Sequence, residues 1–121
     1  MYHIGTDIVE IARIHEAVDR WGQGFLYRIY TDSEVNQCGM RFASLAARFA
    51  GKEALIKALG TGNKGVSWRE IEILSQPGGK PQVRLSGRTQ REATSLGISE
   101  FSISLSHSEE YAIAFVLGES K

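Results

Sequence analysis

The sequence predicts one small domain that mixes helices and strands, with helices mainly in its first half and strands mainly in its second. The chain has 121 residues, which suits one domain with one core. Apolar residues recur at helical spacing from 11 to 59, and most of those from 66 to 117 alternate as in strands. Neither a repeat nor a linker divides the chain, so we expect a single domain over residues 1–121.

The composition is that of an ordinary globular protein. Hydrophobic residues make up 42% of the chain and charged residues 23%. Fourteen basic residues balance fourteen acidic ones, which argues against nucleic-acid binding through a broad basic face. Cys38 is the single cysteine, so an internal disulfide is excluded. Because the sequence contains neither an apolar run of membrane-spanning length nor a secretory signal pattern, we expect a cytoplasmic protein.

The first elements are a strand followed by short helices. Residues 2–9 are rich in strand formers and predict a strand. Apolar residues at helical spacing predict an amphipathic helix over 11–21, and a short helical turn is expected over 25–30. Thr31 precedes Glu34 by three residues, the spacing of a capping box, which predicts that a helix begins there.

The clearest helix is expected over residues 41–59. Its apolar residues recur at offsets of three and four and form an inward stripe, made of Phe42, Leu45, Ala46, Phe49 and Ala50. The continuation of this stripe reaches Glu53, Ile56 and Lys57. Gly60 then follows as a natural helix terminator.

The second half is predicted to be mainly sheet. Residues 66–74 alternate with one slip near Arg69, which indicates a strand with a turn or bulge at that point. Gly78 and Gly79 predict the turn of a hairpin. The elements expected after this turn are a strand at 80–85, a polar helix at 87–96, and strands at 101–105 and 111–117.

Two acidic residues stand out as candidates for chemistry. Glu53 and Lys57 are four residues apart on one helix face, which by itself is typical of a surface ion pair. Because both continue an apolar stripe, however, we expect them to face protein rather than water. Asp7 lies in an apolar strand and could simply cap the helix that begins near Glu10. Together, Asp7 and Glu53 could instead hold a hard cation such as Mg²⁺ beside a phosphate.

Other motifs are weaker. The stretch GTGNKG at 60–65 matches a dinucleotide fingerprint in letters only, because it follows a helix and precedes a strand rather than the reverse. Its backbone amides could still approach a phosphate. His107 is expected in a polar hairpin tip, where a structural histidine is the simpler interpretation. One cysteine and three scattered histidines predict no zinc site.

Three longer motifs stand in order along the chain: IGTDIVEIARI, RFAGKEALIKALGTG and SISLSHSEEYAIAFV. Shorter stretches, TDSE, WREIEI and GKPQVRLSG, lie between them. Together they resemble the holo-acyl-carrier-protein synthases, the small bacterial 4′-phosphopantetheinyl transferases, over nearly the whole chain. The resemblance implies an α+β fold in which an antiparallel sheet packs around a long central helix.

The resemblance also implies an activity. With Mg²⁺, or Mn²⁺ in its place, a serine hydroxyl of apo acyl carrier protein attacks the β-phosphate of coenzyme A in line. Phosphopantetheine moves to the serine, and adenosine 3′,5′-bisphosphate leaves. Holo acyl carrier protein of this kind serves fatty acid biosynthesis, although the sequence leaves open which carrier is used. The family works as a homotrimer with active sites at subunit interfaces.

Motif by motif, the resemblance assigns roles to particular residues. Asp7 and Glu53 match the acids that bind the metal, and Lys57 matches a lysine that contacts phosphate. Glu53 is also the best candidate for taking the serine proton, and a relay through a bound water is favoured because a metal lowers its basicity. The residues that match the coenzyme site are Arg48, Lys57, Gly60, Thr61, Gly62 and His107.

Two further expectations concern the arginines. Arg48 and Lys57 are nine residues apart, on opposite sides of an ideal helix, so they should contact different parts of the coenzyme or serve two sites. The carrier is typically acidic, which makes Arg13, Arg20 and Arg28 candidates for docking it. Solvated surface arginines are the alternative. A metal-dependent phosphohydrolase and a non-enzymatic binding subunit are the other functions that these residues would suit.

Overall fold

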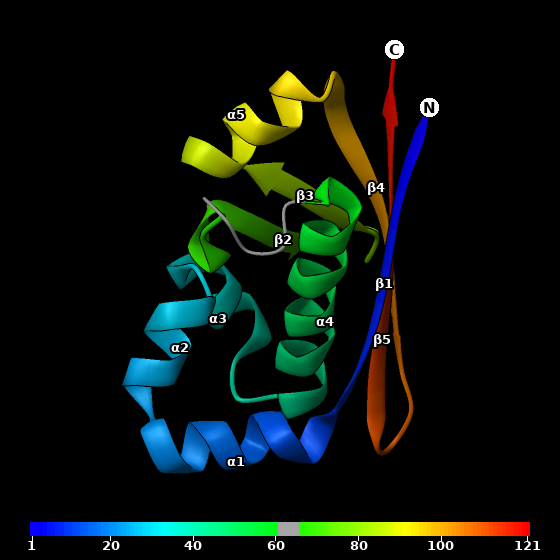
Figure 1. Ribbon diagram of the computed structural model, residues 1–121. Helices are drawn as coiled ribbons and strands as arrows, with labels where there is room; N and C mark the ends of the chain where they lie inside the picture. Colours follow the sequence, from blue (N-terminus) through cyan, green and yellow to red (C-terminus); the bar gives the residue numbers. More distant parts are fainter. Residues whose placement is uncertain (61–65) are drawn as a thin grey trace.

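The structure, a computed structural model, describes residues 1–60 and 66–121 (Figure 1). It is an α+β fold, as the sequence predicted. None of the described helices combines the length and apolar character needed to cross a membrane. The elements in chain order are β1 (Tyr2–Glu10), α1 (Ile11–Trp21), α2 (Gln23–Ile29), α3 (Asp32–Cys38), α4 (Phe42–Leu59), the 3₁₀ helix η1 (Trp68–Glu70), β2 (Ile71–Ser75), β3 (Pro81–Leu85), α5 (Gly87–Ser95), β4 (Ile98–His107) and β5 (Tyr111–Ser120).

A three-stranded antiparallel sheet joins the two ends of the chain. Its strand order is β1-β5-β4, so the last strand lies between the first and the fourth. Asp7 is paired with Ala114, and Ala114 in turn with Leu105. The side chains of Ala112, Ala114 and Val116 on β5 are buried on one face, as expected from the alternation of a strand. Figure 1 shows this sheet edge-on, with α4 against one side and both termini at one end.

Helix α4 lies at the centre of the molecule and is buried on almost every side. It packs against all three strands of the sheet on one side and against α1, α3 and β2 on the other. Twelve of its 18 residues are buried, including Arg48 and Lys52. The inward stripe predicted from the sequence is therefore only part of the buried surface, because a helix enclosed by two layers has no fully polar face.

Two glycines allow the close packing of α4. A Cβ atom at Gly5 of β1 would fall 1.8 Å from the carbonyl oxygen of Ala54, which is backbone and cannot move aside. A Cβ at Gly51 would fall 2.7 Å from the Cδ1 atom of Ile73. Only glycine therefore lets β1 and α4 approach as they do. This close approach places the residues that follow Gly5 directly beside the second half of α4.

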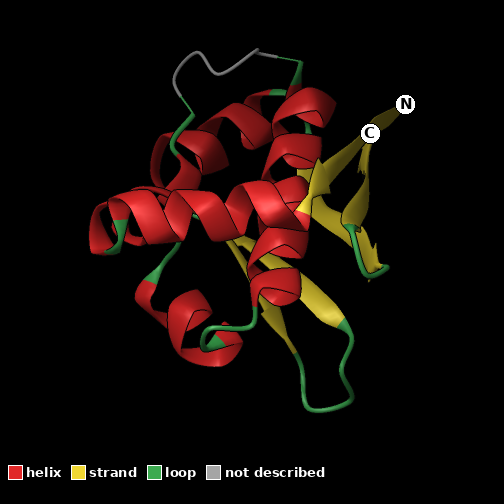
Figure 2. Ribbon diagram, turned by 90° about the horizontal axis from the view of Figure 1, so that it is seen from below, coloured by secondary structure: helices red, strands yellow, loops and turns green. Residues whose placement is uncertain are grey.

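Helices α1, α2 and α3 lie toward the end of the molecule opposite the two chain termini (Figure 2). Their buried side chains join the first half of α4 in one cluster, made of Ile14, Val18, Leu26, Ile29, Tyr30, Cys38, Leu45, Ala46, Ala47 and Ala112. The Thr31–Glu34 capping box is present, with the Glu34 amide donating to Thr31 Oγ1 at 3.2 Å and the Thr31 amide donating to Glu34 Oε1 at 2.9 Å. The predicted start of α3 is thus confirmed.

The β2–β3 hairpin forms a second, separate two-stranded sheet. The turn or bulge predicted near Arg69 is found here as the 3₁₀ helix η1, whereas the strand predicted to run from residue 66 begins only at Ile71. The slip in alternation marks this change of backbone geometry. Glu70, at the end of η1, accepts hydrogen bonds from the Arg88 and Thr89 amides and so caps the start of α5.

Candidate active site

Asp7, Glu53 and Lys57 form a cluster where β1 crosses α4. The Lys57 ammonium donates to Asp7 Oδ1 at 3.0 Å and to the carbonyl oxygen of Thr6 at 3.1 Å. Glu53 lies one helical turn before Lys57 on the same face of α4. Residues that are about 50 positions apart in the sequence are thereby brought together, as the motif comparison predicted.

The environment of this cluster is partly shielded from water. The side chain of Asp7 is 19% exposed, whereas that of Lys57 is 54% exposed. Burial raises the pKa of Glu53, the nearby Asp7 carboxylate raises it further, and the Lys57 ammonium lowers it. A carboxyl group whose pKa is raised by a neighbouring carboxylate attracts a cation, because a cation relieves the repulsion between the two.

Two simpler interpretations of these residues are wrong. Asp7 does not cap α1, since the residue at the helix start is Glu10, whose side chain makes no capping hydrogen bond, and Asp7 lies inside β1 opposite Ala114. The second is a simple surface ion pair between Glu53 and Lys57, because the ion pair of Lys57 is with Asp7 on β1. The expectation that Lys57 faces protein was also wrong in part, because about half of its side chain is exposed.

The fully buried lysine of α4 is Lys52, which lies outside the apolar stripe predicted from the sequence. Its ammonium donates to Glu34 Oε1 at 2.7 Å, to the Trp68 carbonyl at 3.0 Å and to the Ile71 carbonyl. Glu34 also accepts a hydrogen bond from the Ile73 amide at 2.8 Å. Both side chains of the pair are 0% exposed. Burial lowers the pKa of Lys52, and the Glu34 carboxylate opposes this.

This buried pair joins α3, α4 and β2. All three ammonium protons of Lys52 have an acceptor, which is what a buried ammonium requires. A second sequence signal could have found it, since Lys52 follows Leu45 by seven residues and precedes Leu55 by three, both at helical spacing. Because Lys52 is adjacent to Glu53, the pair also fixes the rotation of α4 at the candidate site.

Arg48 is buried and makes its hydrogen bonds within the chain. Its guanidinium donates to the Ile73 carbonyl, the Ser44 carbonyl, Gln37 Oε1 and Ser75 Oγ. It therefore lies against α3 and β2, whereas Lys57 lies against β1, and the predicted opposite placement of the two is confirmed. Since its side chain points away from β1, a coenzyme contact of Arg48 stays a prediction.

Of the remaining predicted coenzyme residues, the structure describes Gly60 and His107. Gly60 has a left-handed conformation, with φ of 74°, and ends α4 as expected. Thr61 and Gly62 lie outside the described residues. His107, the exposed last residue of β4, is paired with Ala112 on β5, which is paired with Val9 on β1. Two strand spacings, about 10 Å, therefore separate the backbone of His107 from that of β1.

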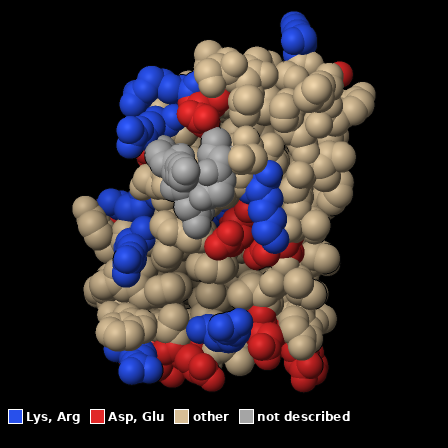
Figure 3. Space-filling model, in the orientation of Figure 1, with Lys and Arg blue, Asp and Glu red and all other residues tan. Residues whose placement is uncertain are grey.

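The three arginines proposed for docking are exposed. Arg13 and Arg20 lie on α1, and Arg28 lies on α2. The guanidinium of Arg20 stacks over the ring of Trp21, with 5.1 Å to the ring centroid. Figure 3 shows basic and acidic side chains interspersed on the visible face of the molecule, so charge on this face is local rather than uniform.

The residues of the cluster fit a magnesium ion. Mg²⁺ in proteins is usually held by one or two carboxylates, with water and substrate phosphates completing its coordination. Asp7 and Glu53 supply two such carboxylates, and the Thr6 carbonyl points at the same place. Within residues 1–60 and 66–121, no group of three or more His, Cys, Asp or Glu side chains is placed so that it could hold a metal ion.

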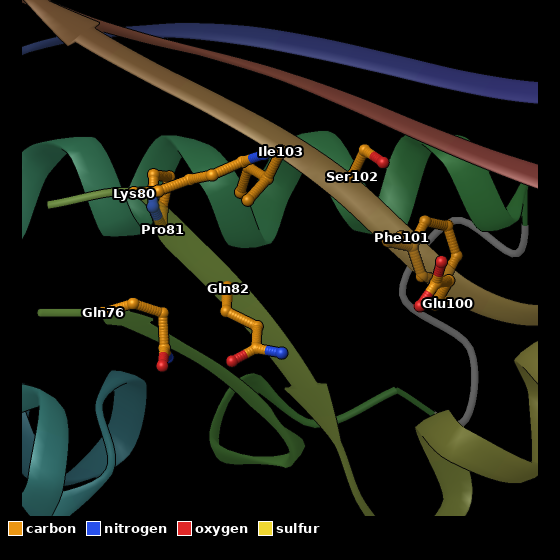
Figure 4. A pocket seen from close by; sticks show the side chains of 8 residues that line it. All are labelled: Gln76, Lys80, Pro81, Gln82, Glu100, Phe101, Ser102 and Ile103. Atoms are coloured by element: carbon orange, nitrogen blue, oxygen red, sulfur yellow. The ribbon is translucent and has the colours of Figure 1, made fainter. Parts of the chain in front are cut away.

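A cavity of about 420 Å³ lies elsewhere, between the β2–β3 hairpin and β4 (Figure 4). Gln76, Lys80, Pro81 and Gln82 line it from the hairpin, and residues 100–103 line it from β4. Asp7, Glu53 and Lys57 are not among its lining residues. The cluster of Asp7, Glu53 and Lys57 is therefore distinct from this cavity.

Comparison with known proteins points to one family. A family model described as the 4′-phosphopantetheinyl transferase superfamily matches residues 3–116. A holo-[acyl-carrier-protein] synthase of Herpetosiphon aurantiacus is 51% identical over 121 residues, covering 94% of this chain and 95% of the relative. One of Dehalococcoides mccartyi is 53% identical over 119 residues, covering 98% of this chain and 99% of the relative.

Solved structures agree with this result. The holo-[acyl-carrier-protein] synthase of Helicobacter pylori in complex with coenzyme A has a TM-score of 0.88 and 38% identity, covering 96% of this chain and 99% of that one. The enzyme of Neisseria meningitidis has a TM-score of 0.89 and 41% identity, and 98% of each chain is covered. Since the family model spans residues 3–116 and relatives about half identical match over nearly the whole length, the chain belongs to the holo-[acyl-carrier-protein] synthases of the 4′-phosphopantetheinyl transferase superfamily.

Proposed function

We propose that this enzyme transfers 4′-phosphopantetheine from coenzyme A to a serine of apo acyl carrier protein, in a Mg²⁺-dependent reaction that releases adenosine 3′,5′-bisphosphate. The observation that carries the proposal is the convergence of Asp7, Glu53 and Lys57 at the crossing of β1 and α4. The names of the relatives, one of them solved with coenzyme A, support the substrate class.

In the proposed mechanism, each residue of the cluster has one task. Asp7 and Glu53 would hold the Mg²⁺, which would offset the negative charge of the pyrophosphate and of the leaving group. Lys57 places its ammonium against a phosphate oxygen as a point charge. Glu53, whose pKa is raised in the free protein, accepts the serine proton directly or through a water. Gly5 keeps β1 close enough to α4 for the three to act together.

The direct test is the mass of the carrier after incubation with this protein, coenzyme A and Mg²⁺. We expect apo acyl carrier protein to gain one phosphopantetheine group. Cleavage of coenzyme A without modification of the carrier would indicate a phosphohydrolase instead, and no reaction of either kind would indicate a binding protein. Omission of Mg²⁺ with added chelator should abolish the gain in mass.

Arg13, Arg20 and Arg28 are proposed to dock the acidic carrier. All three are exposed, and Arg13 and Arg20 are seven residues apart, two turns along one side of α1. Exposed cations of this kind speed association with an anionic partner and are sensitive to salt. The docking surface would thus lie on a different helix from the acids that hold the metal.

Arg13→Glu is expected to raise KM for the carrier about tenfold or more, because it replaces an attraction to the acidic partner by a repulsion. Coenzyme A binding, measured by calorimetry, should not change. The control is Arg84→Glu on β3, which makes the same charge change outside the proposed docking surface. Equal values of KM in the wild type and the Arg13 variant would remove Arg13 from the docking surface.

The assembly is proposed to be a homotrimer formed through the outer face of the three-stranded sheet. Large apolar side chains on this face are exposed: Ile4 by 56%, Ile8 by 60%, Ile113 by 44% and Phe115 by 47%. None of the described helices covers that side of the sheet in Figure 1. A contiguous apolar surface of this kind is typical of a protein interface. Such an interface would bring copies of β1, which carries Asp7, toward one another.

Light scattering of the purified protein should give three times the chain mass of 13.4 kDa. Phe115→Glu should reduce this mass to that of one chain, because a carboxylate would be desolvated in an apolar interface. A monomeric wild type would contradict the proposed assembly without affecting the proposed chemistry.

A cytoplasmic location and a role in fatty acid biosynthesis complete the proposal. Growth of a strain that lacks the protein, with and without added fatty acids, would test the biosynthetic role.

A further inference from the structure

The Lys57 ammonium is bonded to two oxygen atoms beside the place where Asp7 and Glu53 would hold a metal. It contacts Asp7 Oδ1 at 3.0 Å and the Thr6 carbonyl oxygen at 3.1 Å, both on β1. Glu53 is close enough to both charges that Asp7 raises its pKa and Lys57 lowers it. One ammonium therefore partly neutralises two carboxylates.

The Lys57 ammonium and a divalent cation compete for Asp7. Carboxylate and carbonyl oxygens are the ligands of choice for Mg²⁺, and they are also good acceptors for an ammonium. If a doubly charged ion bound the carboxylate that holds Lys57, the ion and the ammonium would repel each other. Each cation therefore weakens the binding of the other to Asp7.

Lys57 is able to move. Its side chain is 54% exposed, and it is a long flexible chain at the surface of α4. An exposed ion pair of this type contributes little to stability, so the ammonium can leave Asp7 at a small cost. An anionic phosphate placed beside the cluster would offer it a new partner of higher charge. Lys52, by contrast, is fully buried and is held by three acceptors, so it cannot take this part.

We propose that Lys57 acts as a displaceable internal cation, which keeps the affinity of the free enzyme for divalent metal low and releases Asp7 when a diphosphate group draws the ammonium away. This inference rests on the proposed function, because it takes Asp7 and Glu53 as the metal ligands. It predicts that metal and the diphosphate of the co-substrate bind cooperatively. By linkage, each must then raise the affinity for the other by the same factor.

The test is Mn²⁺ binding to the protein without coenzyme, measured from the free-ion signal in electron paramagnetic resonance. Lys57→Gln should bind Mn²⁺ about tenfold more tightly than the wild type, which corresponds to about 1.4 kcal/mol. Lys80→Gln is the matched control, since it removes the same charge from the exposed hairpin and should leave the affinity unchanged. Thermal unfolding of each variant checks that the fold is retained.

A second pair of variants isolates the contact with Asp7. In an Asp7→Asn background, Lys57→Gln should tighten Mn²⁺ binding much less, because the ammonium there acts on the Glu53 carboxylate alone. Equal affinity in the wild type and Lys57→Gln, or no measurable binding by either, would overturn the inference while carrier modification by the wild type continued. Absence of carrier modification would instead overturn the proposed function, so the two failures can be told apart.

Discussion

Glu53→Gln is expected to lower the rate of phosphopantetheine transfer by at least about a hundredfold, the scale seen when one electrostatic contact to a developing charge is removed. The amide keeps the shape of the side chain but removes its charge and its ability to accept a proton. Both proposed tasks of Glu53, holding the metal and receiving the serine proton, depend on that carboxylate. The measurement is the initial rate of mass gain of the carrier at saturating coenzyme A and Mg²⁺.

The same variant should not unfold the protein. The raised pKa of Glu53 means that the folded state disfavours its charged form relative to the unfolded chain, so an uncharged amide removes a cost. The unfolding temperature should be unchanged or higher than that of the wild type. Glu92→Gln on α5 is the control, with an expected normal rate. Near-normal transfer by Glu53→Gln would contradict its assignment, and a lowered unfolding temperature would place its effect on the fold.

Lys52→Met is expected to lower the free energy of unfolding by about 3–5 kcal/mol, the cost of leaving one partner of a buried ion pair alone. The Glu34 carboxylate would then remain fully buried without its cation, and the carbonyls of Trp68 and Ile71 would each lose a donor. The measurement is urea denaturation at a fixed protein concentration, since assembly would also contribute to stability. A loss of this size is a large part of the stability of a domain of this length.

Lys57→Met on the same helix is the matched control, because it makes the same change in a half-exposed ion pair. It should cost less than about 1 kcal/mol. If Lys52→Met proves too unstable to measure, the double variant Lys52→Met/Glu34→Gln removes both charges and should be the more stable of the two. Similar costs for the two single lysine variants would contradict the structural role given to the buried pair.

Local signals in the sequence predicted most elements of the fold. The strand at the start, the capping box at Thr31 and the end of α4 at Gly60 each depend on a few neighbouring residues, and each is found in the structure. The slip in alternation near Arg69 predicted a turn or bulge, and the 3₁₀ helix at Trp68–Glu70 lies at that point. The strand was predicted to begin at residue 66 rather than at Ile71, because a pattern of period two does not fix the end of a strand within a few residues.

The candidate site shows the same division. The sequence by itself singled out Asp7, Glu53 and Lys57 as candidates, because ordered motifs resemble one family. From helix geometry alone it predicted that Arg48 and Lys57 point in opposite directions. Only the tertiary structure decided which lysine is buried. Periodicity reports one face of a helix, whereas α4 is enclosed by layers on two sides, so Lys52 is buried with Glu34 and Lys57 reaches across to Asp7 on β1.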